Sequence, residues 1–134
     1  MRFLPLIFIA FLISCGNSDH GNSHDTEIPD RTGNFVHTVY LNIHDTLPQN
    51  DIDFMILEMK KIQDIPKVLN FTCGEFEDVM DDRAMDRYEL VMQMEFDNID
   101  DYKIYQEHPI HLNLRKVAAG YLSERPAVHD FIIH

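Results

Sequence analysis

Residues 35–43 read Phe-Val-His-Thr-Val-Tyr-Leu-Asn-Ile, and this stretch decides the fold. In a strand, successive side chains point to opposite faces. One face then carries Phe35, His37, Val39, Leu41 and Ile43. The other face carries Val36, Thr38, Tyr40 and Asn42. Neither face is strongly polar, which indicates a strand that is covered on both sides, with helices over the first face.

The segment after this strand predicts a helix. Five apolar side chains recur at helical spacing, namely Ile52, Met55, Ile56, Met59 and Ile62. The helix is expected to open near Pro48 and to stop at Asp64-Ile65-Pro66, because proline disfavours helical backbone in the residue before it. Further strands are expected at residues 68–75 and 88–96, where even positions from 88 to 96 are all apolar.

The last third of the chain completes the pattern. Asn98 is placed to cap a short helix, and Pro109 is placed in the first turn of a second one that ends near Gly120. A final strand is expected at residues 128–133. The order βαββαβ predicts a single α+β domain, from residue 34 to 134, with a ferredoxin-like four-stranded antiparallel sheet and helices on one face.

The sheet face without helices needs a cover. It is expected to carry Val36, Tyr40, Val68 and Val91 among polar neighbours. A homodimer in which two such sheets pack face to face would bury these side chains.

The N-terminus predicts the location of the protein. Residues 1–14 resemble a bacterial lipoprotein signal peptide, with a basic start and an apolar run that is too short to span a bilayer. Cys15 then stands where a lipidated cysteine would, and residues 15–33 form a polar, flexible tether in which His20 and His24 are expected to be solvated. An ordinary cleaved signal is the alternative. The expected location is the bacterial cell envelope, with the domain lipid-anchored on the periplasmic or surface side.

Charge and cysteine content exclude several classes of partner. The formal net charge is −12, which disfavours binding to nucleic acid or to anionic surfaces. If Cys15 carries lipid, Cys73 has no partner for an intramolecular disulfide, and its apolar surroundings predict a small buried side chain. The sequence therefore relies on packing, and it contains no Gly-rich phosphate loop or nucleophile motif.

The stretch from residue 105 to 111, Tyr-Gln-Glu-His-Pro-Ile-His, is the best candidate for a functional site. His111 falls on or beside the inward stripe of its predicted helix, and His37 lies on the helix-covered face of the first strand. A neutral imidazole in apolar surroundings can accept a proton, and Tyr105 can donate a hydrogen bond to a carbonyl oxygen or an oxyanion. His108 is either a further ligand contact or a brace for the helix break at Pro109.

Two other interpretations of these residues compete with a ligand site. Buried histidines and tyrosines often bond only to backbone groups at the ends of helices and strands. If Phe54, Met59 or Leu114 fills the space beside His111, no ligand can enter. Metal binding is not expected, because a proline separates His108 from His111 and no carboxylate is placed to complete a metal-ligand pattern; no cofactor is expected either.

From residue 34 onward the chain resembles the stress-responsive A/B barrel (Dabb) domains of the dimeric α+β barrel superfamily. The matching pieces are Val36-His37-Thr38-Val39, Ile65-Pro66-Lys67-Val68, Tyr88-Glu89-Leu90-Val91, Tyr105-x-x-His108-Pro109-x-His111 and Val128-x-Asp130-Phe131. The resemblance implies a homodimer and a cavity between each sheet and its helices.

The resemblance also implies candidate roles. A plant polyketide cyclase is similar in having a histidine and a tyrosine at the positions of His111 and Tyr105, as general base and hydroxyl donor, with the position of His37 lining the pocket. The main hypothesis is a membrane-anchored binding module for a small apolar or carbonyl-containing ligand, with Tyr105, His111, His37 and His108 as its polar contacts. The alternatives are a cyclase-like or lyase-like enzyme, and a structural stress protein without a ligand; whether the chain is an enzyme stays open.

Overall fold

The computed structural model describes residues 33–134. The signal peptide, the lipidation site at Cys15 and all of the tether except Gly33 lie outside these residues. The described chain forms β1 (Phe35–Leu41), α1 (Gln49–Lys60), the 3-10 helix η1 (Lys61–Asp64), β2 (Leu69–Glu75), β3 (Leu90–Phe96), α2 (Ile99–Glu107), α3 (Pro109–Ala118) and β4 (Ala127–Ile132). In this part of the chain no helix is long and apolar enough to cross a membrane.

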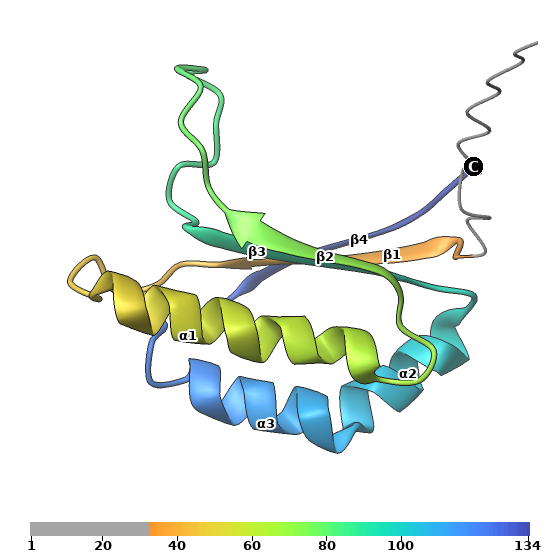
Figure 1. Cartoon of the computed structure of the whole chain (residues 1–134). Helices are drawn as coiled ribbons and strands as arrows, with labels where there is room; N and C mark the ends of the chain where they lie inside the picture. The colour runs from red at the N-terminus through yellow and green to blue at the C-terminus, as the bar shows by residue number, and fades with distance from the viewer. Residues whose placement is uncertain (1–32) are drawn as a thin grey trace, which may run out of the picture.

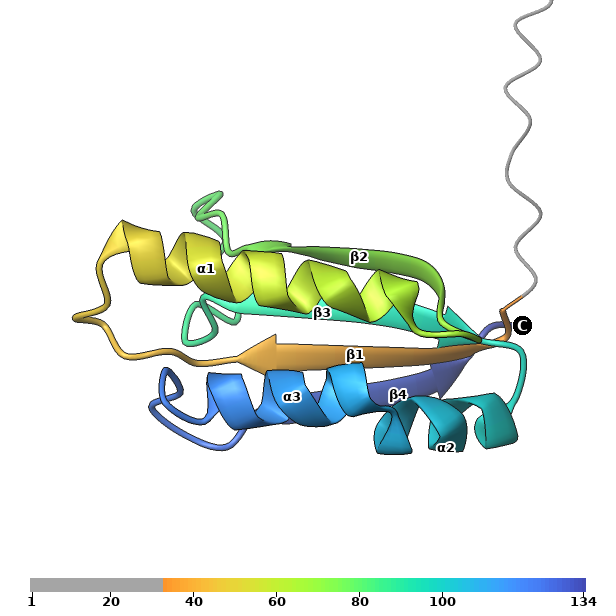
Figure 2. The same cartoon turned by 60° about the horizontal axis from the view of Figure 1, so that its bottom comes forward.

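The four strands form one antiparallel sheet in the order β2-β3-β1-β4, which is the ferredoxin-like arrangement that the sequence predicts. All helices lie on one face of the sheet (Figure 1). Helix α1 runs along the side of β2 and β3, whereas α2 and α3 run along the side of β1 and β4 (Figure 2). The sequence prediction of fold and element order is confirmed, with strand ends differing by one or two residues.

The core lies between the sheet and the helices. Strand β3 supplies Leu90, Met92, Met94 and Phe96, and helix α1 with η1 supplies Met55, Met59 and Ile62, each at most 5 % exposed. Their spacing of two in the strand and three or four in the helix is the periodicity from which these elements were predicted. Packing of these two rows fixes how α1 sits on the sheet.

One prediction for the open face is wrong. Val68 packs against the core under the helices instead of on the open face. The cause is an irregularity in β2: Leu69 pairs with Glu95 and Thr72 with Gln93, so three residues span a distance that two span in β3. Asn70, within this bulge, has φ 46°, and its side-chain amide donates to Glu95 Oε2 at 2.8 Å. The extra residue reverses the side-chain alternation before it.

The remainder of the open face combines apolar and polar side chains. The register places Val36 beside Glu95 and Phe131, and Tyr40 beside Val91 and Ala127. Val36 is only 1 % exposed in the single chain, whereas Phe131 is 42 % exposed. Val36 is therefore already covered within the single chain, whereas Phe131 is exposed and Tyr40 and Val91 are only partly buried.

Candidate functional site

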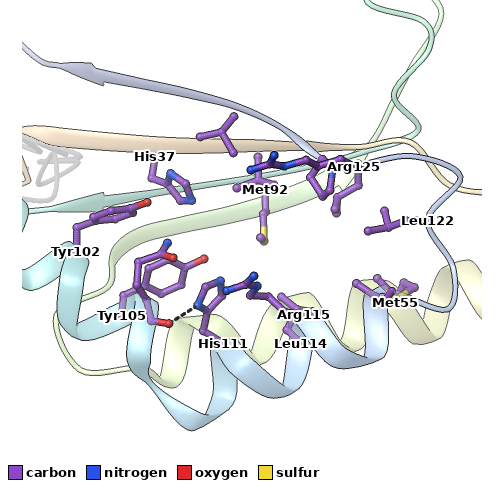
Figure 3. A pocket seen from close by; sticks show the side chains of 17 residues that line it. His37, Met55, Met92, Tyr102, Tyr105, His111, Leu114, Arg115, Leu122 and Arg125 are labelled. Atoms are coloured by element: carbon purple, nitrogen blue, oxygen red, sulfur yellow. Dashed lines mark hydrogen bonds between the residues drawn. The ribbon is translucent and has the colours of Figure 1, made fainter.

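A cavity of about 350 Å³ lies between the sheet and helices α2 and α3 (Figure 3). Its apolar wall includes Val39 and Leu41 of β1, Met92 of β3 and Leu114 of α3. Its polar lining residues are His37, Tyr102, Tyr105, Gln106, His111, Arg115 and Arg125. A mostly apolar hollow with a few convergent polar groups is the usual form of a small-molecule site.

The space beside His111 is open. Phe54 and Met59 do not line the cavity, and Leu114 forms part of its wall without filling it. The ring of Phe54 packs at a tilt against Tyr121, with 6.1 Å between ring centroids, and Met59 is fully buried in the core. The packing that would have excluded a ligand is therefore absent from this part of the domain.

Tyr105 presents a buried hydroxyl to the cavity. The residue lies in the last turn of α2 and is 0 % exposed. Its hydroxyl has no hydrogen-bond partner among the described residues. Burial raises the pKa of the phenol well above its usual value, and the neighbouring Tyr102 adds to the rise. At neutral pH the group is thus a protonated donor whose partner the domain itself does not supply, which is uncommon for a buried polar atom.

His111 lies against Tyr105 from the first turn of α3. The two rings stack with centroids 4.2 Å apart and an angle of 29°. The imidazole Nδ1 is 3.0 Å from the carbonyl oxygen of Gln106. Because a carbonyl only accepts, Nδ1 carries the proton, and Nε2 keeps a free lone pair. Burial lowers the pKa of His111, and the charge of Arg115 lowers it further against the opposing effect of the Gln106 bond.

His37 faces the same cavity from the sheet. Its Nδ1 is 2.6 Å from Asp130 Oδ1, on the neighbouring strand, at the position directly opposite in the register. An ionised carboxylate only accepts, so Nδ1 carries a proton, and in the neutral imidazole Nε2 is the free acceptor. The ring packs edge-on against Tyr102 and Tyr105, at 5.1 and 5.8 Å between centroids. Two imidazoles with fixed tautomers thus flank one phenol.

His108 has a different position. Its Nδ1 accepts a hydrogen bond from the backbone N–H of Ile110 at 3.3 Å, so the imidazole caps α3. It is not among the residues that line the cavity. This geometry does not support the predicted contact of His108 with a ligand. The capping bond instead supports the alternative role, in which His108 braces the helix break at Pro109.

Cys73 packs against the core from β2 and is partly buried. Burial raises the pKa of its thiol, with a smaller opposing effect from Lys60, so the thiol stays protonated at neutral pH. Within residues 33–134, no three His, Cys, Asp or Glu side chains are grouped as metal ligands.

Sequence reasoning missed four polar residues of this region: Tyr102, Arg115, Arg125 and Asp130. Tyr102 precedes Tyr105 by three residues, and this helical spacing is a usable signal that both face the same way. Asp130 belongs to a motif of the family resemblance, but the sequence did not assign it a role. Its contact with His37 follows from the pairing of β1 with β4, which the sequence does not define. The two arginines carry no local signal, because their placement depends on where α3 and the segment before β4 run.

Comparison with known proteins places the fold. A family model described as the stress responsive A/B barrel domain matches residues 35–133. Comparison with curated proteins found no match. Among solved structures, a dimeric ferredoxin-like protein from Thermobifida fusca has a TM-score of 0.63 and 22 % identity, covering 75 % of this chain and 92 % of that one.

Two further solved structures are similar. A Dabb family protein with a ferredoxin-like fold from Mesorhizobium loti has a TM-score of 0.59 and 22 % identity, covering 76 % of this chain and 98 % of the other. A hydroxynitrile lyase from Passiflora edulis has a TM-score of 0.66 and 20 % identity, covering 77 % and 95 %. At these identities the likeness establishes the shared fold.

Proposed function

Because the chain belongs to the stress-responsive A/B barrel domain family, we propose that it is a homodimeric, membrane-anchored binding protein for a small, mostly apolar ligand that carries a carbonyl oxygen. The observation that carries this proposal is the hydroxyl of Tyr105, which has no hydrogen-bond partner among residues 33–134, at a cavity of about 350 Å³. A carbonyl oxygen is the partner that a neutral phenol donor lacks.

The residues around the Tyr105 hydroxyl favour a ligand-binding site over a packed core in which every polar group has a hydrogen-bond partner. Leaving a buried donor without a partner costs about 1–3 kcal/mol, so a tyrosine kept only for packing would be better replaced by phenylalanine. The two imidazole Nε2 atoms add acceptors that a ligand hydroxyl can meet. Most of the remaining wall consists of aliphatic or thioether side chains, which suits an apolar body.

Tyr105→Phe tests this role. Acetophenone, an apolar probe with one carbonyl oxygen, is titrated calorimetrically into the full chain. We expect the Tyr105→Phe variant to bind about five- to tenfold more weakly, the effect of one lost hydrogen bond. Its free energy of unfolding in urea should stay the same or rise, since an unpartnered buried hydroxyl has been removed.

Tyr121→Phe is the matched control, because Tyr121 packs against Phe54 and does not line the cavity. It should bind acetophenone like the unmodified chain. If the unmodified chain does not bind acetophenone, or Tyr105→Phe binds it equally well, the binding proposal is wrong and the structural interpretation stands.

The homodimer follows from the open sheet face. The solved relatives from Thermobifida fusca and Bacteroides fragilis are both dimeric proteins of this fold. On this chain, Tyr40, Val91 and Phe131 leave apolar surface on the face without helices. A second copy packed on it, sheet to sheet, would remove that surface from water.

We expect sedimentation to give the mass of two chains, and a Val91→Glu variant to give the mass of one, because a carboxylate would be buried without a partner. Leu112→Glu is the control, since Leu112 lies 48 % exposed on α3 and away from the sheet. A single-chain mass for the unmodified protein, or a dimer that survives Val91→Glu and dissociates with Leu112→Glu, would contradict the proposed interface.

Membrane attachment rests on the sequence at Cys15. Acyl chains on this cysteine would hold the domain at a bilayer through a tether of about 18 residues, since each buried CH₂ contributes about 0.8 kcal/mol. A cell that expresses the chain and is fed labelled palmitate should incorporate label into the membrane-bound protein. Cys15→Ser should lose both label and membrane attachment, and Cys73→Ser should keep both; retention of label in Cys15→Ser would refute the anchor.

A lyase-like enzyme is the second candidate, and the fixed tautomers of His37 and His111 favour it. Each imidazole has its Nδ1 occupied and its Nε2 free to take a proton, with a phenol donor between them. A hydroxynitrile lyase shares the fold. On mandelonitrile, Nε2 of His111 would take the hydroxyl proton, the bond to the nitrile carbon would break, cyanide would leave with the electron pair, and benzaldehyde would remain.

Release of benzaldehyde from mandelonitrile is followed by absorbance. His111→Ala should reduce the rate about 10²- to 10⁴-fold, and His44→Ala, on an exposed side chain, should not. The base is active when neutral, and burial lowers its pKa from 6.5. The rate should therefore persist below pH 6.5 and fall as pH drops through the lowered value. No benzaldehyde above the uncatalysed rate, or equal loss in both variants, would exclude this activity.

A further inference from the structure

The charges around the cavity contrast with the charge of the chain. The protein has 23 acidic and 11 basic residues, yet the 17 residues that line the cavity include two arginines and no aspartate or glutamate. Arg115 comes from α3, and Arg125 comes from the segment just before β4. Figure 3 shows both side chains reaching toward the space between sheet and helices.

Neither arginine is paired within residues 33–134. The other two arginines in this part of the chain each form an ion pair. Arg83 contacts Asp81 at 2.7 Å, and Arg87 contacts Glu124. In the described chain, the side chains of Arg115 and Arg125 form neither an ion pair nor a hydrogen bond with another residue. In a protein with an excess of twelve negative charges, two cations without carboxylate partners at one cavity are a feature that packing does not require.

The guanidinium of Arg115 also acts on the groups inside the cavity. Its charge lowers the pKa of both Tyr105 and His111, against the larger effect of burial on Tyr105 and together with it on His111. Arg115, Tyr105 and His111 also line the same cavity, so a ligand group that reaches Arg115 is close to the phenol and the imidazole. The arginines and the unpartnered hydroxyl face one volume.

We infer that Arg115 and Arg125 form an anion subsite, so that the ligand of the proposed binding function is a small apolar carboxylic acid whose carbonyl or hydroxyl oxygen meets Tyr105. The planar guanidinium fork matches the two oxygens of a carboxylate. The inference rests on the proposed function, because it names the chemical class of the ligand in the same cavity. It also gives the ligand a direction, with the carboxylate toward the two arginines and the other oxygen toward Tyr105.

The test uses two probes of equal shape and different charge. The compounds are 4-acetylbenzoate and its neutral amide, 4-acetylbenzamide, each titrated into the full chain. We expect the carboxylate to bind about tenfold more tightly than the amide at low ionic strength, the gain of charge-assisted contacts with two exposed arginines. The preference should shrink in 1 M salt, where screening acts over about 3 Å.

Arg115→Gln and Arg125→Gln together should bring the ratio of the carboxylate affinity to the amide affinity close to one. Arg83→Gln is the control, since Arg83 is paired with Asp81 outside the cavity, and it should keep the tenfold ratio. Both affinities are measured on the same double variant. A folding defect would abolish binding of the amide as well as the carboxylate, whereas loss of the anion subsite would remove only the advantage of the carboxylate.

The outcomes distinguish this inference from the function on which it rests. If the amide and acetophenone bind but the carboxylate has no advantage, or keeps its advantage in the double variant, the anion subsite is wrong and the binding function stands. If none of the three probes binds, both are wrong.

Discussion

The break between α2 and α3 is the constraint on which the site depends. Pro109 has no N–H, so it cannot donate to Tyr105, whose carbonyl is met instead by His108 N at 3.1 Å. In an unbroken helix the carbonyl of Gln106 would accept from Ile110 N, but the imidazole of His108 takes that donor. The freed Gln106 carbonyl then fixes His111. One proline thus places Tyr105 at the end of one helix and His111 at the start of the next, within stacking distance.

The sheet supplies the second half of the same arrangement. Strand β1 is central, between β3 and β4, and its helix-covered face turns His37 toward the break. Asp130 meets His37 because the antiparallel register sets them directly opposite each other. A shift of one residue in β4 would turn Asp130 to the open face and leave a buried imidazole without its acceptor. The site therefore specifies the strand register, in addition to being positioned by it.

How far the sequence predicts this site depends on the range of the interactions involved. Alternation in β1 and β3, the spacing in α1, the Asn98 cap and the Pro109 start are local patterns, and each was readable. The faces of His37 and His111 followed from them. Val68 was misplaced because a bulge, here with Asn70 at positive φ, leaves no clear local signal. Asp130 and the two cavity arginines are set by register and by the path of α3, which only the assembled fold defines.

The polar groups of the cavity share one electrostatic preference. A phenol with a raised pKa donates and does not ionise at neutral pH, and two guanidinium groups add positive potential. Such an environment stabilises an oxygen more strongly the more negative charge it carries. A neutral carbonyl would be held moderately, and a developing oxyanion more firmly. The geometry that suits the binding of oxygenated ligands therefore also favours the charge change of a base-initiated reaction. Whether a bound ligand only binds or also reacts depends on whether one of its protons lies within reach of Nε2 of His37 or His111.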